Sequence, residues 1–424
     1  MLARLIRIFE SSRLLHLFIV TACIQGGVII SQFLIAPIVG PSVVGEVRAL
    51  ETILALVVLA GSLGMQSIAT RDTAACRDEA AQRRVLHQVF ILVCLSASVV
   101  MVGIFLANRF MFHSALSASV YMACGVVLLT NLLRVTTGYA QGAKAISEIY
   151  VVLLLATGVG VALHVVLTKN YGIQGWVAAR YITEVICLAG VWWRLRQHVF
   201  AALRMPGTER GQLWDRAFSG VTNNASLFVR LLVDSLPVLM LTALHARVEE
   251  IGFFGLANLS LVFGLLPLAI LAQRAITDLV DVLDDKQVLV ARFNGFLRSM
   301  LLISSAMAAA LVIVALVWLF GVGGQYQETA KYVAILAVSL PLKAGGLACG
   351  TMLLALRVFG LSLKVNMLEG LLVLLILFFG IPNFGGWAGV MAYMAGTLLS
   401  VVLLMAAVKI RLANHYGSHD HAGR

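Results

Sequence analysis

Charged side chains inside otherwise apolar stretches are the residues of this sequence best suited to chemistry. Arg230 and Asp234 are four residues apart, the spacing that brings two side chains to one face of a helix. Lys343 follows Pro341 in one apolar stretch, and Glu369 lies in the next. An ionisable residue in the middle of a membrane is costly and is by default a functional candidate. Because a guanidinium can bind phosphate oxygens in a bidentate manner, Arg230 is suited to contact an anionic group.

Each of these residues also has a structural interpretation. Arg230 and Asp234 either line a cavity or neutralise each other as an i,i+4 ion pair on one helix face. Lys343 has no acidic neighbour within one helical turn of the sequence. Glu369 is therefore its candidate partner across helices, either for packing or for proton coupling. The interpretations are compatible, because even a paired arginine in a membrane must face protein or water rather than lipid.

Further polar residues in apolar stretches complete the candidate set. Arg180 and Glu184 repeat the i,i+4 spacing, which favours a structural ion pair over a role in coupling. Arg48 lies near one end of its stretch and either lines a cavity or reaches the membrane surface. The remaining candidates are amides, which hydrogen-bond either a hydroxyl-rich substrate or a neighbouring helix: Gln25, Asn223 and Asn224.

The composition places these residues in a membrane protein. Of 424 residues, 61% are hydrophobic and only 12% are charged, with a mean hydropathy of +0.97. A soluble domain carries about 25% charged residues, and a membrane helix needs about 20 mostly apolar ones. Twelve segments meet this description: 14–37, 43–69, 87–107, 117–138, 148–168, 172–193, 217–243, 250–273, 296–320, 329–356, 361–381 and 385–408. We therefore expect an all-α polytopic membrane protein with twelve transmembrane helices.

The positive charges support this count and set the orientation. If the N-terminus is cytoplasmic, the loops predicted outside contain Arg109, Lys169, Arg247 and Lys331, and the other loop arginines and lysines lie inside. This asymmetry follows the positive-inside rule, and a miscounted span would have exchanged the sides of every later loop. Both termini are therefore expected in the cytoplasm. The formal net charge of +11 is explained by this location and does not indicate a nucleic-acid partner.

Two similar stretches indicate an internal repeat. Residues 170–179 read "NYGIQGWVAA" and residues 383–392 read "NFGGWAGVMA", and each forms the predicted outside turn before the last span of its half. A second pair, "GPSVVGEVRAL" (40–50) and "ARVEEIGFFGLANL" (246–259), leads into the second span of each half. Glycine permits the tight reversal, and small residues at helical spacing permit close helix packing.

The repeat and the charge pattern together predict the domain organisation. We expect an N-terminal six-helix lobe (1–199), a cytoplasmic linker (200–212) and a C-terminal six-helix lobe (213–424) that ends in a short disordered tail. The two lobes are parallel repeats, because six spans return the chain to the same side. Such repeats place a substrate site in a central cavity at the lobe interface.

Several functions are disfavoured by what the sequence does not contain. It has no Gly-x-x-x-x-Gly-Lys-Ser/Thr motif for nucleotide phosphates and no Cys-x-x-Cys pair. The predicted outside loops are all short, which argues against a membrane-bound glycan polymerase or ligase. We expect neither enzymatic activity nor a cofactor or bound metal.

Three stretches resemble the MOP exporter superfamily, and more narrowly its polysaccharide flippases of the Wzx type. They are "APIVGPSVVGEVRALETILALVVLAGSLGMQSIATRD" (36–72), "GIQGWVAARYITEVI" (172–186) and "VFGLSLKVNMLEGLLVLLILFFGIPNFGGWAGVMAYMAGTLLSVV" (358–402). Spans one, two, seven and eight line the cavity in that family. The resemblance therefore implies cavity-lining roles for Gln25, Arg48, Asn223, Asn224 and Arg230. Similar lipid II flippases usually carry two further C-terminal spans.

The resemblance also implies a function. Flippases of this type move undecaprenyl-pyrophosphate-linked oligosaccharide repeat units across the bacterial inner membrane by alternating access, for lipopolysaccharide O-antigen or exopolysaccharide synthesis. Their partners are the lipid-linked sugar, membrane lipids, and the polysaccharide polymerase and chain-length regulator. The alternative is a cation-coupled multidrug exporter of the same superfamily. Such an exporter would be expected to carry acidic residues in its cavity, whereas the basic and acidic residues here are at best balanced.

Overall fold

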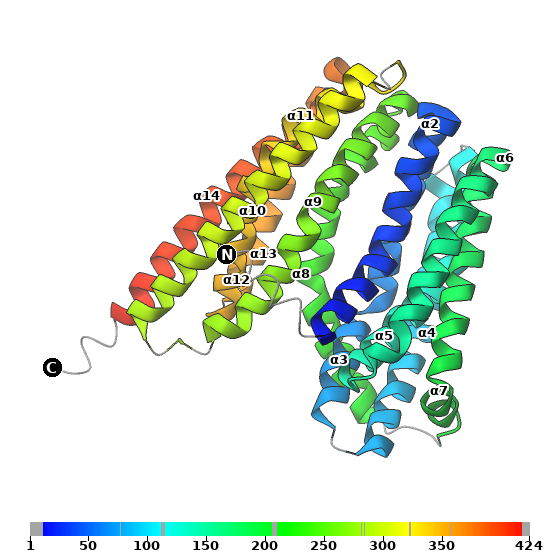
Figure 1. Ribbon diagram of the computed structural model, residues 1–424, viewed down its shortest axis with the longest axis vertical. Helices are drawn as coiled ribbons and strands as arrows, with labels where there is room; N and C mark the ends of the chain where they lie inside the picture. Colours follow the sequence, from blue (N-terminus) through cyan, green and yellow to red (C-terminus); the bar gives the residue numbers. More distant parts are fainter. Residues whose placement is uncertain are drawn as a thin grey trace. The chain divides into compact units, whose positions relative to one another are not determined.

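The computed structural model describes residues 12–76, 78–111, 115–205, 210–280, 282–283, 285–321, 324–356 and 358–417, and these are almost entirely helical (Figure 1). They form two compact units, Met1–Phe228 and Val229–Arg424, and the division falls within helix α8. Residues 206–209 of the predicted linker and residues 418–424 of the disordered tail predicted over 415–424 lie outside the described residues, whereas residues 200–203, 210–212 and 415–417 are helical.

Unit 1 is built from long apolar helices around one hydrophobic core. Its helices are α2 (Ser12–Ser62), α3 (Met65–Ala75), α4 (Glu79–Met111), α5 (Ala115–Gly142), α6 (Ile146–Arg194), α7 (Arg196–Leu203) and the first part of α8 (Arg210–Ala243). Leu86 and Val89 of α4 meet Tyr139 of α5 and Ile149 of α6 in this core, and all four are buried. The short helix α7 adds Val199 to the same core.

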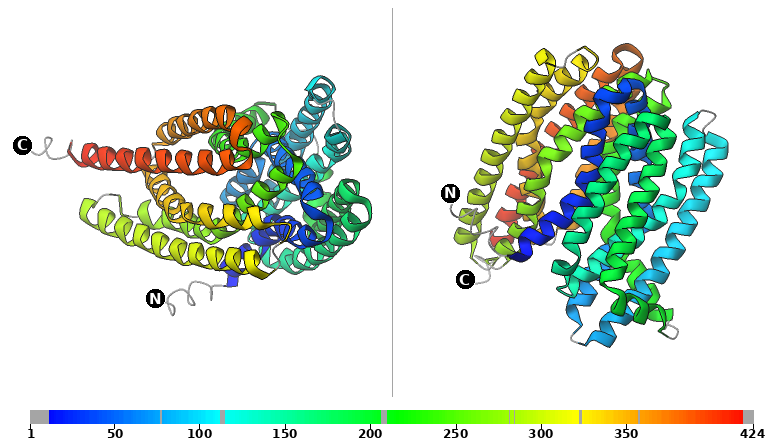
Figure 2. Two further views of the ribbon diagram at one scale, coloured as in Figure 1. Left: turned by 90° about the horizontal axis from the view of Figure 1, so that it is seen from above. Right: turned by 45° about the vertical axis from the view of Figure 1, so that its right-hand side comes forward.

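Unit 2 has its own core. After the end of α8 it contains α9 (Val248–Val280), α10 (Lys286–Gly321), α11 (Gln327–Ala337), α12 (Ser339–Ala355), α13 (Phe359–Phe384) and α14 (Gly386–Gly417). Leu268 of α9, Met300 of α10 and Met352 of α12 pack together with Leu404 of α14. Helices α13 and α14 run side by side (Figure 2).

The helices fit the predicted spans once the breaks inside them are considered. Within the described residues, eight helices are long and apolar enough to cross a membrane, or nine if the bent pair α11 and α12 counts as one span. Helices α2 and α6 each merge two spans, because Gly40 and Gly172 have non-helical backbone angles part-way along them. Together with α8, this gives the twelve-helix, two-lobe fold expected from the sequence.

The internal repeat is visible in the backbone itself. Gly172 has φ 58° and ψ −138°, and Gly385 has φ 52° and ψ −127°, so the two similar stretches turn in nearly the same way. This conformation is accessible to glycine at little cost and is strained for other residues. The structure therefore aligns Asn170-Tyr171-Gly172 with Asn383-Phe384-Gly385 and identifies these glycines as the hairpin residues.

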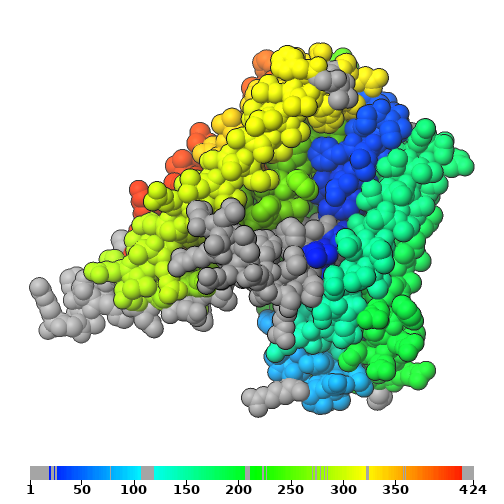
Figure 3. Space-filling model, viewed as in Figure 1, coloured from blue at the N-terminus to red at the C-terminus, as the bar shows by residue number. Residues whose placement is uncertain are grey.

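The outer surfaces of the helices are apolar, as a lipid environment requires. Helix α10 forms a long outer surface of unit 2 (Figure 3). Only 17% of the residues in its most apolar 18-residue segment are buried. Its exposed side chains include Leu302, Ile313, Val314 and Val317. An exposed apolar face of this extent would be unfavourable in water, and it matches a helix that contacts lipid.

The two hairpin glycines predict different costs for substitution by alanine. Gly172→Ala adds only the backbone strain, on the order of 1–3 kcal/mol, because a Cβ there meets nothing within 4 Å. Gly385→Ala adds the same strain and also places the Cβ against the carboxylate of Glu250. We expect Gly385→Ala to lower the thermal unfolding midpoint of the purified protein more than Gly172→Ala.

Gly158→Ala is the matched control, since Gly158 is helical and a Cβ there also meets nothing within 4 Å. It should leave the midpoint nearly unchanged. Equal losses for Gly172→Ala and Gly385→Ala would contradict the role assigned to Glu250.

Candidate functional site

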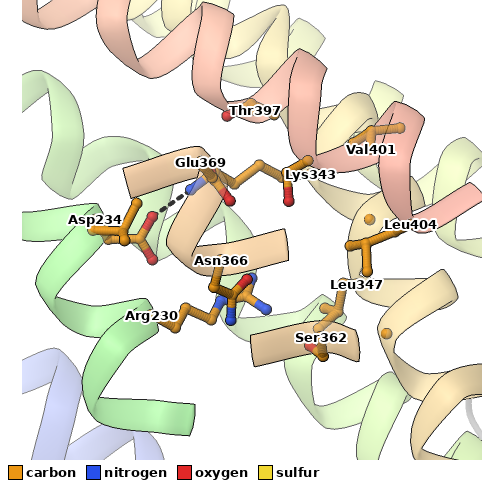
Figure 4. Close-up of a pocket in the computed structure, with 14 residues that line it drawn as sticks. Arg230, Asp234, Lys343, Leu347, Ser362, Asn366, Glu369, Thr397, Val401 and Leu404 are labelled. Carbon is orange, nitrogen blue, oxygen red and sulfur yellow. Dashed lines mark hydrogen bonds and ion pairs between the residues drawn. The ribbon is translucent and has the colours of Figure 1, made fainter. Parts of the chain in front are cut away.

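A polar cavity lies inside unit 2, between α8, α12, α13 and α14 (Figure 4). It encloses about 510 Å³ of empty space, including space open to solvent. Four of the charged residues singled out in the sequence line it: Arg230, Asp234, Lys343 and Glu369. They come from three helices that are far apart along the chain, so tertiary packing creates the cluster.

Lys343 and Asp234 form the central ion pair of this cavity. The Nζ atom of Lys343 donates a hydrogen bond to Oδ1 of Asp234 at 2.6 Å. The same Nζ lies 4.1 Å from the ring centroid of Tyr393, within the range of a cation–π contact. The Lys343 side chain is 8% exposed and that of Asp234 is 36% exposed, so the lysine is the more deeply buried partner.

This pairing shows which partner Asp234 has. Asp234 bonds to Lys343 on α12, and Arg230 makes no ion pair within the described part of the chain. Arg230 is exposed and extends from α8 toward α13 (Figure 4). The partner predicted for Lys343, Glu369, lines the same cavity but does not bond to it. The cavity therefore presents a guanidinium whose i,i+4 carboxylate is already engaged.

Hydroxyl and amide groups line the remaining wall of the cavity. Ser362, Asn366 and Glu369 share one face of α13, because they are spaced i, i+4 and i+7. Thr397 and Ser400 share a face of α14 at i and i+3. The sequence reasoning did not identify these residues other than Glu369. The regular helical spacing of these polar residues within two apolar spans could have predicted that they face a cavity.

Unit 1 holds a second charged cluster of a different kind. Arg180 Nη1 donates to Glu184 Oε1 at 2.9 Å, and Arg180 Nε lies 3.2 Å from Glu51 Oε1. Trp176 Nε1 also donates to Glu51, at 2.8 Å. The three charged side chains are at most 12% exposed. Because the arginine is held between two carboxylates, this cluster joins α2 to α6, in keeping with the structural interpretation favoured from the spacing.

Two other sequence candidates whose side chains are described, Asn224 and Arg48, do not line the cavity of unit 2. Asn224 is buried, and its Nδ2 donates to the carbonyl oxygen of Leu59 at 2.8 Å, which fixes the middle of α8 to α2. Arg48 is buried in unit 1, and its Nε has no hydrogen-bond partner among the described residues. The side chains of Gln25 and Asn223 lie outside the described part of the structure. Among the described residues, no group of three or more His, Cys, Asp or Glu side chains could hold a metal ion.

Comparisons of the sequence with family models and with curated proteins gave no match. Solved structures do match. An inward-facing multidrug resistance MATE family transporter of the MOP superfamily is 14% identical, with a TM-score of 0.77 over 93% of this chain and 96% of its own. The chain has the fold of the MOP-superfamily transporters.

Two further MOP-superfamily structures show the same fold. An outward-facing multidrug resistance MATE family transporter is 15% identical, with a TM-score of 0.68 over 96% of both chains. A MOP-superfamily transporter from Pyrococcus furiosus is 14% identical, with a TM-score of 0.67 over 95% of both chains. The latter is described as having a binding pocket of reverse polarity that suggests a different function. At such low identity the likeness extends to the fold alone.

The Lys343–Asp234 pair predicts a strongly non-additive stability effect. Asp234→Asn leaves the buried ammonium of Lys343 without its counter-charge and should lower the free energy of unfolding by about 3 kcal/mol. This is the lower end of the range for broken buried ion pairs, because Asp234 is 36% exposed. Lys343→Met leaves the more exposed carboxylate and should cost less. The double variant Asp234→Asn/Lys343→Met should be more stable than Asp234→Asn alone.

Thermal unfolding of the four proteins in detergent measures this coupling. Additive losses, with the double variant the least stable, would show that the pair does not hold α8 to α12. Lys331→Met is the matched control, because Lys331 pairs with Glu328 at an exposed position. An exposed pair contributes about 0–1 kcal/mol, so this variant should unfold like the wild type.

Proposed function

We propose that this protein is a flippase that moves undecaprenyl-pyrophosphate-linked oligosaccharide repeat units across the bacterial inner membrane. The observation that carries the proposal is Arg230, an exposed guanidinium in a cavity where Lys343 is already neutralised by Asp234. A guanidinium is always charged and matches two phosphate oxygens at once. The pyrophosphate of a lipid-linked sugar is an anion of this shape, and it has no favourable path through lipid without such a partner.

The rest of the cavity wall suits the same ligand. Ser362 offers a hydroxyl donor, and Asn366 offers an amide with two donors. These groups can donate to phosphate oxygens that Arg230 does not reach. When Glu369 is ionised, its negative charge balances the positive charge of Arg230. Protonation of Glu369 would leave the cavity with one net positive charge for the anion. This is the proton-coupling role that the sequence suggested for Glu369.

The fold supports transport by alternating access. The solved structures that resemble this chain include an inward-facing and an outward-facing transporter, the two states that alternating access requires. The three structures described above are transporters, which supports a transport role for this protein. The prenyl chain can stay in the membrane during transport, so the protein needs to shelter only the pyrophosphate and the sugars.

The same proposal implies a location and partners for the protein. It would reside in the inner membrane with both termini in the cytoplasm, where its substrate is assembled. Its product would be delivered to a polysaccharide polymerase and a chain-length regulator on the other side, for O-antigen or exopolysaccharide synthesis.

A multidrug exporter is the second candidate, because the fold likeness includes multidrug resistance transporters. Such a protein would use the carboxylates Asp234 and Glu369 for organic cations or coupling ions. The Lys343–Asp234 bond weakens this alternative, since it occupies one of those carboxylates with a cation of the protein itself.

Deletion of the gene separates the two functions. A flippase deletion should cause lipid-linked repeat units to accumulate on the cytoplasmic side and should abolish surface polysaccharide. An exporter deletion should leave the polysaccharide unchanged and increase sensitivity to cationic drugs, an outcome that would overturn the proposal.

Substitution of Arg230 tests the site within the flippase proposal. A charge-assisted hydrogen bond contributes about 1.5–3 kcal/mol, so Arg230→Ala should reduce the rate of repeat-unit translocation at least about tenfold. Arg230→Lys should retain part of the rate, because it keeps the charge but loses the bidentate geometry. The rate is measured as surface polysaccharide in deletion cells that express each variant at equal levels.

Arg298→Ala is the matched control, because Arg298 is an exposed arginine of α10 that does not line the cavity. It should support wild-type amounts of polysaccharide. Full activity of Arg230→Ala would remove Arg230 from the site.

A further inference from the structure

Unit 2 has a second, larger cavity, which lies at the end of the unit where α13 turns into α14. The ends of α8 and α13 and the starts of α9, α11 and α14 surround it, and it encloses about 1530 Å³ including space open to solvent. Arg247 lies in this region, and the topology predicted from the sequence places it on the side opposite the cytoplasm.

The carboxylate of Glu250 connects two parts of the cavity wall. Glu250 Oε1 accepts hydrogen bonds from Nε and Nη2 of Arg247 at 2.9 and 2.7 Å. Glu250 Oε2 accepts the backbone N–H of Gly386 at 2.9 Å. Because Gly385 turns with a positive φ directly against this carboxylate, the hairpin is fixed on the start of α9. The cavity is therefore preformed.

Aromatic rings form much of the wall. Trp387 and Tyr332 pack edge to face with their ring centroids 4.9 Å apart. Tyr332 is 3% exposed and Trp387 is partly buried, while Phe384 is 58% exposed. Phe253 adds a fourth ring. Aromatic belts at membrane surfaces also contain tryptophan and tyrosine, but those rings face lipid, whereas these rings line an open cavity.

The polar groups of the cavity fit a neutral ligand rich in hydroxyls. The charges are compensated, since Arg247 pairs with Glu250 and Lys331 pairs with Glu328 at 2.6 Å. Asn383 is exposed at the turn and offers both an amide donor and an acceptor. Carboxylate oxygens of Glu328 add acceptors for hydroxyl groups. Flat apolar rings next to amide and carboxylate groups are the surroundings that a sugar ring needs, with its C–H face on the aromatic ring and its hydroxyls on the rim.

We propose that this cavity binds neutral sugar rings of the oligosaccharide carried by the lipid, with Trp387 as the stacking platform. The inference rests on the proposed function for the identity of the sugar and on the cavity geometry for its chemistry. It assigns the two parts of the substrate to two places in unit 2, with the pyrophosphate at Arg230 and the sugars near the α13–α14 turn.

Tryptophan fluorescence of the purified full-length protein tests the proposal. The sequence has 6 tryptophans, so the change must be assigned by substitution. The probe is the water-soluble repeat-unit oligosaccharide released by mild acid from the surface polysaccharide of the host cells. We expect a saturable change in emission with the wild type, no such change with Trp387→Phe, and an unaltered change with the control Trp318→Phe. Trp318 stacks on Tyr326 and does not line the cavity.

Binding strength provides the second measurement. Phe384→Ala and Asn383→Ala alter exposed rim residues and should weaken oligosaccharide binding about tenfold, without a change in the thermal unfolding midpoint. Phe379→Ala is the matched control, because Phe379 is an equally exposed aromatic residue of α13 outside the cavity, and it should bind like the wild type. The absence of saturable binding by the wild type would overturn the proposal, as would an undiminished signal in Trp387→Phe.

These outcomes are distinguishable from failure of the flippase function. If gene deletion abolishes surface polysaccharide but the oligosaccharide does not bind, the flippase proposal stands and the sugar site is wrong. If the oligosaccharide binds through Trp387 but deletion leaves polysaccharide unchanged, the cavity is a sugar site of a protein with another function.

Discussion

A lysine ammonium buried among membrane helices requires an opposite charge within hydrogen-bonding distance, and the arrangement of unit 2 depends on this requirement. Lys343 satisfies it with Asp234, which fixes α12 to α8 at a bond of 2.6 Å. The bond engages Oδ1 of Asp234 with Lys343 rather than with Arg230, although Asp234 and Arg230 share a helix face. The high cost of charge in a membrane thus both positions two helices and leaves one guanidinium available to a ligand.

The same requirement is met differently in unit 1. There Arg180 lies between Glu51 and Glu184, and Trp176 donates to Glu51, so every charged partner is engaged within the cluster. Two halves that share a repeat have therefore used their buried charges for different purposes. In unit 1 this cluster joins α2 to α6, whereas in the described part of unit 2 the Lys343–Asp234 pair leaves Arg230 without an ion pair in a polar cavity. Since function resides in such sites rather than in the fold, the MOP-superfamily fold alone does not select the substrate.

The duplicated hairpin shows how one backbone device can serve two structural roles. Gly172 and Gly385 have nearly the same backbone angles, yet a side chain at the first would meet open space and one at the second would meet Glu250. The Glu250 carboxylate binds the second hairpin, and that hairpin lines a cavity with aromatic walls. The stretch that first marked the repeat thus also contributes Trp387 to a candidate sugar site, a role that the repeat alone did not suggest.

The sequence by itself determined the membrane class, the number of spans and the existence of the repeat. These properties follow from hydropathy, from charge location and from local glycine signals, which are read along the chain. It also indicated Arg230, Asp234, Lys343 and Glu369 as candidates, because an ionisable residue in an apolar stretch is conspicuous. Only the tertiary structure decided which of them are partners. The i,i+4 spacing offered Arg230 as one possible partner of Asp234, and the structure joined Asp234 to Lys343, 109 residues away. Spacing reports only neighbours on one helix, whereas ion pairs in a membrane protein are selected by which helices pack together.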